Sequence, residues 1–220
     1  MTSRADQPFT VRCRCARTGD GGEGWYNRHN GRVIPGSVPT KGRLLLATPP
    51  LDDPNFDRTV VYVLEHHDEG ALGLVINRPS EEELTGPLDA WSDLQREPAC
   101  VFAGGPVETD ALIALARTTA EADESGHLAP LTPEIASADL SADPALVATT
   151  ISQLRVFRGY SGWGPGQLEG EIETGAWLVL DPVPSDVFTD HPDELWRTVL
   201  RRQPGRLAWL ASAPDDLAAN

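Results

Sequence analysis

The sequence contains a single lysine, Lys41, and only three cysteines, Cys13, Cys15 and Cys100. With one lysine and no Walker loop, lysine-based phosphate or Schiff-base chemistry is not expected. An odd number of cysteines without four-ligand spacing argues against a disulfide framework and against a zinc site. No apolar run approaches the ~20 residues that a membrane-spanning helix needs, and the first residues lack the apolar segment of a secretory signal. We therefore expect a cytoplasmic protein that does not cross a membrane.

Charge is distributed unevenly along the chain, whose formal net charge is -15. Residues 1–43 carry eight basic residues against three acidic ones, whereas the remainder carries 10 basic against 30 acidic residues. An acidic body repels a phosphate backbone, so we do not expect it to bind nucleic acid. It suits solubility, a basic partner or no specific role.

Residues 1–41 are rich in Gly, Arg and polar residues and have no lasting apolar period. Such a composition cannot build a core, so we expect a disordered basic N-terminal arm there. The native protein could instead start later, for example near Val38. The ordered domain is expected over residues 42–220.

Short apolar runs predict the strands of this domain. Residues 42–48, 59–64 and 71–77 are predicted strands, and the last two are close enough for a hairpin. The run 59–64 is β-branched and apolar on both faces, which is typical of a central strand. A further strand is predicted over 100–103. The run 111–116 suits a helix by its Ala and Leu content, although we favour a strand. The polar residues 80–97 suit a loop with short helical turns.

Residues 118–143 are acidic and polar, and we expect a mobile loop there with at most a short strand. The strongest helix signal covers residues 144–154. Asp143 suits the N-cap and Pro144 the first helical position, and the apolar residues that follow form one stripe. A second helix is predicted over 193–203, and 205–210 could close the sheet or dock as a short strand. These elements predict an α+β domain with a mixed, largely antiparallel sheet flanked by a few helices.

One glycine-rich stretch, residues 159–169, organises the C-terminal half. We expect a strand, a tight glycine turn, a short helix from Pro165 to Gly175, and a strand over 176–180. Trp163 and Trp177 would anchor the helix ends, since each can bury ~200 Å². The turn could offer backbone N–H groups to an anion, with Arg155 and Arg158 as ion partners. The favoured interpretation is a tight turn that sets strand register.

Three separated motifs carry a resemblance to a known family. They are Ala47-Thr48-Pro49, the run 67–79 that ends in Asn77-Arg78-Pro79, and Gly104-Gly105-Pro106-Val107. Together with the glycine-rich stretch, they resemble the YqgE/AlgH family over roughly residues 42–220. The family has no established biochemical activity, and it is often labelled a transcriptional regulator. The resemblance therefore implies a fold and relatives, with regulation through protein contacts as an expectation, because no helix-turn-helix is evident.

Tests for common chemistry favour structural roles. Gly159-x-Ser161 lacks the last glycine of a nucleophile elbow, because Trp163 occupies that position, so Ser161 is interpreted as a turn residue. The glycine spacing also fails as a dinucleotide fingerprint. His66 and His67 are adjacent residues leaving a strand and rarely chelate together, so we expect turn histidines satisfied by backbone groups.

Three turns of unusual composition remain, and we hypothesise that they converge into a concave binding patch. The preferred function is a non-catalytic binding or regulatory protein, with a small anionic ligand or another protein as partner and with no cofactor or metal. An enzyme using Glu169 or Glu171 as a general base, and DNA binding by the basic arm, are the alternatives. A free sheet edge would also allow a dimer. The patch residues are Asn77, Arg78, Pro79, Gly104, Gly105, Pro106, Trp163, Gly164, Pro165, Gly166, Gln167 and Glu169.

Overall fold

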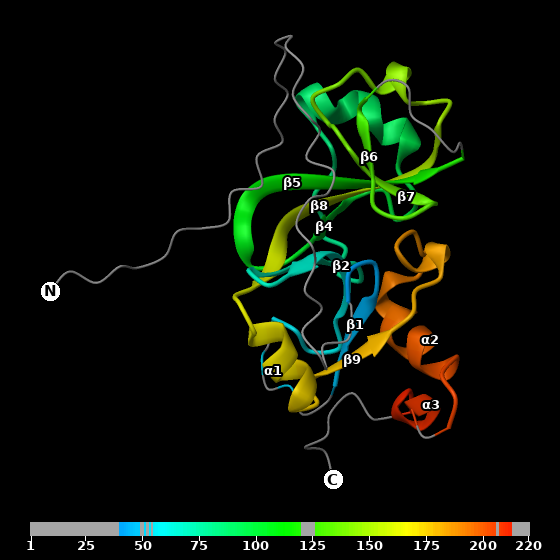
Figure 1. The fold of residues 1–220 in the computed structure, drawn as a ribbon. Coiled ribbons are helices and arrows are strands. Elements are labelled where there is room, and N and C mark those ends of the chain that lie inside the picture. Colours follow the sequence, from blue (N-terminus) through cyan, green and yellow to red (C-terminus); the bar gives the residue numbers. More distant parts are fainter. Residues whose placement is uncertain are drawn as a thin grey trace, which may run out of the picture. The chain divides into compact units, whose positions relative to one another are not determined.

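The computed structural model describes residues 40–48, 51, 53, 55–119, 126–205 and 207–212. Nearly all of the predicted basic arm, residues 1–39, lies outside the described residues. The described strands form one nine-stranded sheet in the order β6-β7-β5-β8-β3-β2-β1-β9, with β4 paired to β8 (Figure 1). The strands are β1 Leu44–Ala47, β2 Val60–His67, β3 Gly70–Val75, β4 Val101–Ala103, β5 Val107–Thr118, β6 Leu128–Pro130, β7 Ile135–Ala138, β8 Ile151–Trp163 and β9 Trp177–Leu180.

The predicted fold class is confirmed. Every strand pair is antiparallel except β4 with β8, so the sheet is mixed and largely antiparallel. The strands β1, β2 and β3 were predicted from their apolar runs, and β2 and β3 form the expected hairpin. The run 111–116 lies within β5, as favoured, because its backbone pairs with both β7 and β8.

The predicted helix over 144–154 is wrong. Asp143 does cap a helical turn, because its Oδ1 accepts a hydrogen bond from the backbone N–H of Ala145 at 2.9 Å. However, the turn is the short 3-10 helix η2, Pro144–Leu146, and the long strand β8 begins at Ile151. Leu146 is 55% exposed and contributes nothing to the expected apolar stripe. β-branched residues at 149–151 favour extended backbone, and pairing on both edges of β8 outweighs the helical pattern.

Two further sequence predictions need correction. Residues 118–143 hold two paired strands, β6 and β7, where at most one short strand was expected. Residues 205–210 do not form a strand, because Leu207–Leu210 is the short helix α3. Helix α2 has already ended at Arg201, Gly205 has a left-handed φ of 67° in the segment that follows, and α3 packs against α2.

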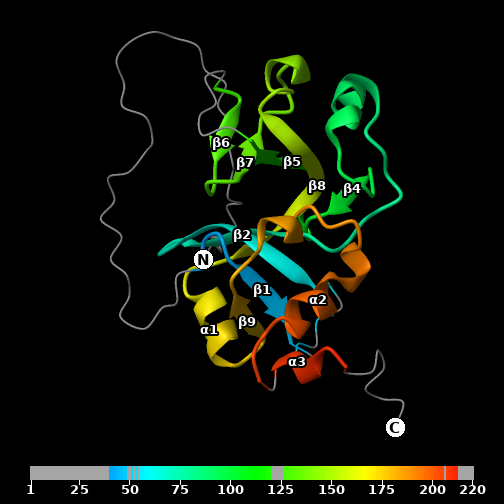
Figure 2. The same ribbon diagram turned by 90° about the vertical axis from the view of Figure 1, so that its right-hand side faces the viewer.

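Helices cover both faces of the β1–β2 part of the sheet. On one face, α1 (Gln167–Glu173) brings Leu168 against Leu45 and Val61. On the other face, α2 (Leu195–Arg201) buries its apolar side chains against Leu44 and Tyr62. Figure 2 shows α1 and α2 on opposite sides of β1 and β9. The remaining helical turns are η1 Gly86–Leu94, η3 Pro184–Asp186 and η4 Pro192–Glu194.

The predicted helices over 165–175 and 193–203 are confirmed by α1 and by η4 with α2. Within the described ranges, no helix is both long enough and apolar enough to span a bilayer.

Candidate functional site at the glycine corners

Two of the three predicted turns lie side by side. Asn77 is buried, and its side chain accepts from the N–H of Val60 at 2.8 Å and donates to the carbonyl of Arg58 at 3.0 Å. Arg78 donates from Nη2 to the carbonyl of Asp57 at 2.9 Å, and its own carbonyl accepts from the N–H of Ala103 at 2.9 Å. The Asn77–Pro79 corner is therefore bonded both to the loop before β2 and to the end of β4.

Glycine is required where the second corner meets β8. Gly105 has φ of 154°, and a Cβ added there would lie 2.2 Å from the carbonyl carbon of Tyr160. Gly159 has φ of 68°, and its Cβ would lie 2.5 Å from the carbonyl oxygen of Gly105. The N–H of Gly104 donates to the carbonyl of Arg158 at 2.8 Å. Two backbones thus pass in direct contact, which only residues without a side chain permit.

An exposed bulge follows this corner, and sequence reasoning missed it. Val107 pairs with Tyr160, but the next pair joins Leu112 to Arg158, so the intervening residues of β5 have no partners on β8. Glu108, the first of them, has φ of 45°, which is uncommon for a residue with a side chain. Glu108, Thr109 and Asp110 are exposed. A Gly-Gly-Pro run directly before an acidic segment was the only sequence signal for this bulge.

Arg158 connects the bulge to the first corner. Its Nε donates to Glu82 Oε2 at 2.8 Å, its Nη2 makes a second bond to the same carboxylate, and its Nη1 donates to the carbonyl of Thr109 at 3.4 Å. The hydrogen bond to Arg158 lowers the pKa of Glu82, and the same bond raises the pKa of Arg158. Arg158 is therefore a partner of Glu82, and it is not placed to serve an anion at the 163–166 turn.

The third predicted turn lies at the other end of β3. Trp163 pairs with Ala71 near the start of β3, whereas Asn77 lies two residues beyond the last residue of β3, Val75. Gly164 donates its N–H to Gln167 Oε1 at 3.1 Å, and Pro165 and Gly166 are exposed. The structure therefore joins two of the three turns. The loop around Phe56 touches both groups, because Phe56 stacks near Trp163 and Asp57 binds Arg78.

Glu171 ties the aromatic side chains of this third turn together. Its Oε2 accepts hydrogen bonds from the indole N–H of Trp163 at 2.9 Å and of Trp177 at 2.7 Å, and its Oε1 accepts from Gln167 at 2.8 Å. The two indole rings meet edge to face, 5.9 Å apart, and the Phe56 ring packs against both. Trp163 is 4% exposed, so it offers no indole face to a ligand. The expected anchoring role of both tryptophans agrees with this packing.

Glu169 belongs to a separate hydrogen-bonded chain. Its Oε1 lies 2.8 Å from His66 Nε2, and His66 Nδ1 lies 2.6 Å from the hydroxyl of Thr40. Hydroxyl, imidazole and carboxylate stand in the order of a nucleophile, a base and an orienting acid. Thr40 is fully buried, however, so the chain holds the start of the domain, β2 and α1 together. The expectation that His66 is satisfied by backbone groups is wrong, whereas His67 Nδ1 does accept from the N–H of Glu69 at 3.2 Å.

Ser161 is not a turn residue. It lies within β8, is fully buried, and donates its hydroxyl to the carbonyl of Gly104 at 3.4 Å. Strand β8 continues through Gly159 and Gly162, so the predicted glycine turn begins only at Gly164. Among the described residues, no group of three or more His, Cys, Asp or Glu side chains is placed to hold a metal ion.

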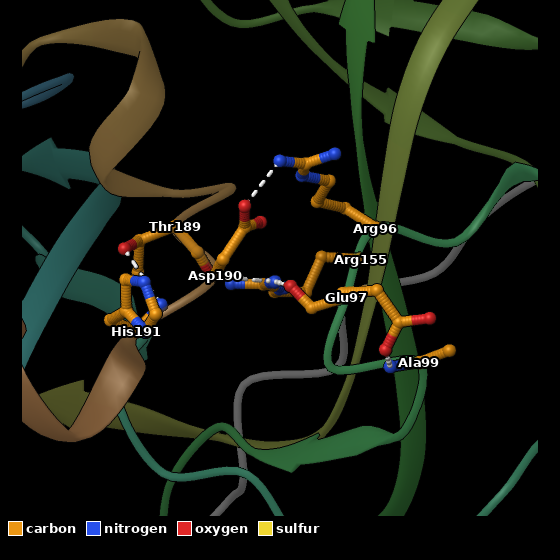
Figure 3. Close-up of polar contacts among 7 residues, drawn as sticks. All are labelled: Arg96, Glu97, Ala99, Arg155, Thr189, Asp190 and His191. Atoms are coloured by element: carbon orange, nitrogen blue, oxygen red, sulfur yellow. Dashed lines mark hydrogen bonds and ion pairs between the residues drawn. The ribbon is translucent and has the colours of Figure 1, made fainter.

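Arg155 was expected to face an anion at the glycine turn. It is instead buried in the interior, away from that turn. It is 1% exposed, and it donates to the carbonyls of Glu97 at 2.8 Å, Thr189 at 3.0 Å and Val187 at 3.1 Å. Figure 3 shows Arg96 reaching Asp190 beside it. Burial lowers the pKa of Arg155 to about 10. Arg155 thus ties β8 to the segment before α2.

The fold and its corners define an α+β protein in which glycine-rich turns lock β4 and β5 onto a long central strand. The chain belongs to the AlgH-like family, whose sequence model matches residues 44–208. It is 49% identical over 184 residues to a UPF0301 protein of Streptomyces coelicolor, covering 81% of this chain and 94% of the relative. A UPF0301 protein of Mycobacterium tuberculosis is 45% identical over 181 residues, covering 81% and 90%.

Two solved structures are similar over most of their length. A crystal structure of a Corynebacterium diphtheriae protein matches with a TM-score of 0.75 and 29% identity, covering 80% of this chain and 93% of that one. The solution structure of the AlgH protein of Pseudomonas aeruginosa matches with a TM-score of 0.60 and 33% identity, covering 82% and 98%. The family resemblance inferred from the sequence motifs is therefore confirmed.

Proposed function

We propose that this protein is a non-catalytic binding or regulatory protein that recognises another protein through the surface formed by its two adjoining corners. This two-corner surface surrounds Arg158 and includes the β5 bulge. Its exposed residues are Pro79, Glu82, Ala103, Pro106, Glu108, Thr109 and Asp110.

The bulge is the observation that carries this proposal. Three exposed residues leave the β8 pairing, and Glu108 adopts a left-handed conformation that its side chain disfavours. Such bulges and strained residues cluster where a protein presents side chains for recognition. The glycine contacts between Gly105 and Tyr160 hold the bulge on a rigid strand, which pre-organises the surface.

The charge of the surface indicates the chemistry of its partner. Glu82 and Asp110 lie near one cation, Arg158, and Glu108 lies beside the Tyr160 hydroxyl, on a chain whose net charge is -15. A basic segment of a partner protein would complement this surface and would be steered toward it.

The internal bonding of Glu169 and Glu171 supports binding over catalysis. These carboxylates were the alternative candidates for a general base. Glu169 is hydrogen-bonded to His66, and both oxygens of Glu171 are taken by Trp163, Trp177 and Gln167. A general base needs its oxygen within reach of a substrate proton.

Charge reversal at the bulge tests the proposal. Purified wild-type protein and the double variant Glu108→Lys/Asp110→Lys are immobilised and exposed to native lysate, and bound proteins are identified by mass spectrometry. The double variant Asp68→Lys/Glu69→Lys is the control, because it changes the net charge equally on the exposed β2–β3 turn. We expect a basic protein that binds wild type and control, is lost from the bulge variant, and is released by salt. Equal retention by all three proteins would rule out the two-corner surface.

A further inference from the structure

Strand β5 is longer than the strand that pairs with its outer edge. It spans the 12 residues Val107–Thr118, whereas β7 pairs only with Ala114–Arg117. Figure 1 shows β7 beside one end of β5, with the other end of β5 extending past it. Among the described strands, none lies along residues 107–113 on the side away from β8. We call this stretch the open β5 edge.

The backbone of Leu112 points out of the sheet at this edge. Leu112 lies opposite Arg158 of β8, whose carbonyl points away from β5 because it accepts from the N–H of Gly104 at 2.8 Å. Opposite residues of an antiparallel pair exchange either both hydrogen bonds or neither, so the N–H and C=O of Leu112 also point away from β8. Pairing further along β5 agrees, because Thr118, an even number of positions away, donates its N–H to Glu134 beside β7 at 3.0 Å.

Strand β7 does not continue far enough to pair with Leu112. Beyond Ala138 the chain turns toward β6, where the N–H of Asp139 donates to the carbonyl of His127 at 2.9 Å. Within the described ranges, no residue is hydrogen-bonded to the backbone of Leu112. A strand with unpaired backbone groups at a sheet edge is a template for another strand.

The bulge of β5 does not block this edge. Bulges often protect an edge by bending the strand away. Here the bulge ends before Leu112, because Leu112 and Ile113 pair with the consecutive residues Arg158 and Phe157 of β8. The two side chains are half-buried and pack into separate core clusters. The backbone at Leu112 is therefore held in the extended form that a second strand needs.

The charge beside the open β5 edge indicates which strand would fit. Glu108 and Asp110 are exposed directly before Leu112, and the neighbouring cation Arg158 is already paired with Glu82. A second copy of this chain would bring its own carboxylates to the same edge, where like charges repel. A segment with basic side chains would be attracted instead.

We infer that a basic segment of a partner protein binds the open β5 edge as an added strand, with backbone hydrogen bonds to Leu112 and cationic side chains beside Glu108 and Asp110. This inference rests on the proposed function, because the two-corner surface includes the bulge, and it specifies how the partner is held. In strand addition the main-chain hydrogen bonds supply affinity and the side chains supply selectivity.

The first experiment measures amide hydrogen exchange by NMR in the full-length protein. The probe is a short peptide of alternating lysine and valine. We expect the N–H of Leu112 to exchange rapidly in the free protein and about tenfold or more slowly with saturating peptide. The N–H of Ile113, which faces β8, should exchange slowly in both states. Protection of Leu112 that rises with protein concentration and without peptide would assign the edge to a second copy and overturn the inference.

The second experiment measures peptide binding by fluorescence anisotropy. A form of the peptide with every backbone amide N-methylated keeps the charges but donates no backbone hydrogen bonds, and we expect it to bind about tenfold more weakly or worse. Leu112→Pro should weaken binding of the unmodified peptide by a similar factor. Proline is tolerated there because the N–H faces no neighbouring strand.

Val179→Pro is the matched control, at the outer edge of β9. The carbonyl of Ala176 accepts from Thr48 at 3.0 Å and so faces β1, which places the N–H of Val179 on the opposite side. We expect this variant to bind the unmodified peptide as the wild type does. Binding lost in Val179→Pro and kept in Leu112→Pro would move the strand to β9 and overturn the inference.

The remaining outcomes separate the inference from the proposed function. Binding that is lost in Glu108→Lys/Asp110→Lys, but is equal for the two peptides and survives Leu112→Pro, would overturn strand addition and leave the proposed function standing. An unmodified peptide that does not bind would also overturn the inference, whereas the proposed function is judged by the lysate capture. Thermal unfolding checks each variant, and if Leu112→Pro does not fold, the two peptides and the exchange of Leu112 decide.

Discussion

The guanidinium carbon of Arg155 lies 4.2 Å from the centre of the Phe102 ring in the interior of the protein. The cation has lost its hydration, and its stabilising partners are this ring and three carbonyl groups on two other segments. Removing a charge from water costs free energy, so a buried Arg155 is stable only while all of these partners are present.

Replacing Arg155 should therefore destabilise the fold strongly. Arg155→Ala leaves a cavity and three carbonyls that have lost their donor, so the free energy of unfolding should fall by about 3–5 kcal/mol. Urea unfolding followed by tryptophan fluorescence measures this change. Arg117→Ala is the matched control, because its exposed pair with Glu134 is worth less than about 1 kcal/mol. Equal losses in the two variants would contradict the role assigned to Arg155.

The raised pKa of Tyr62 should make the free energy of unfolding depend on pH in the alkaline range. Tyr62 is fully buried, and burial raises its pKa above the ordinary value of 10.0, with a smaller opposite contribution from Thr132. Above about pH 10 the unfolded chain releases this proton while the folded chain keeps it, so the free energy of unfolding falls as pH rises. Arg155 acts with the opposite sign, because its pKa is lowered to about 10 and the folded state sheds its proton first.

Tyr62→Phe removes the first of these two contributions. We expect its free energy of unfolding to decline less steeply than that of the wild type between about pH 9 and about pH 11. Urea midpoints measured across this range give the comparison. Parallel declines in both proteins would show that Tyr62 does not retain its proton in the folded state.

The sequence predicted those elements whose local pattern agrees with their tertiary partners. Strands β1 and β2 are apolar on both faces and pack in the core on both faces. Helix α1 ends just before the left-handed Gly175, as predicted, but it begins at Gln167 with Gly166 as its N-cap, so Pro165 is not its first residue. The sequence motifs were also sufficient to identify the family, because three motifs in the expected order are more specific than any one of them.

The errors fall where distant segments decide the structure. Residues 151–154 carry a helical apolar pattern, but β5 pairs with them and makes them a strand. Gly159 and Gly162 look like turn residues, yet both lie within β8, and Gly159 is needed there because its backbone meets the Gly105 carbonyl. The separation of Trp163 from Arg78 follows from the length of β3, which the turn composition alone does not reveal.

The hydrogen bonds from Trp163 and Trp177 to Glu171, which we call the aromatic lock, can be tested by substitution. Glu171→Ala leaves two indole N–H groups without their shared acceptor, and hydrogen bonds to a charged group contribute about 1.5–3 kcal/mol each. We expect a loss of about 3 kcal/mol in the free energy of unfolding, together with a change in tryptophan emission. Glu173→Ala is the control, since Glu173 is exposed on the same helix. An unchanged emission spectrum in Glu171→Ala would argue against the lock.

Gly105 and Gly170 form a matched pair for testing the backbone contact beneath the two-corner surface. A Cβ at Gly105 would meet the Tyr160 carbonyl in a left-handed conformation, whereas a Cβ at Gly170, within α1, meets no atom within 4 Å. Gly105→Ala should therefore lower the free energy of unfolding by about 3 kcal/mol through overpacking and strain. Gly170→Ala should raise it by about 0.5–1 kcal/mol, because alanine favours helix.

Urea unfolding of the two variants measures both expected changes in the free energy of unfolding, the decrease in Gly105→Ala and the increase in Gly170→Ala. If Gly105→Ala were as stable as the wild type, the backbones at Gly105 and Tyr160 could not be in the close contact described. Gly105→Ala should also weaken recognition, because the added Cβ pushes the corner away from β8. In the lysate capture experiment we expect it to lose the partner of the two-corner surface at temperatures where it is still folded. Gly170→Ala should keep that partner, since α1 takes no part in the surface.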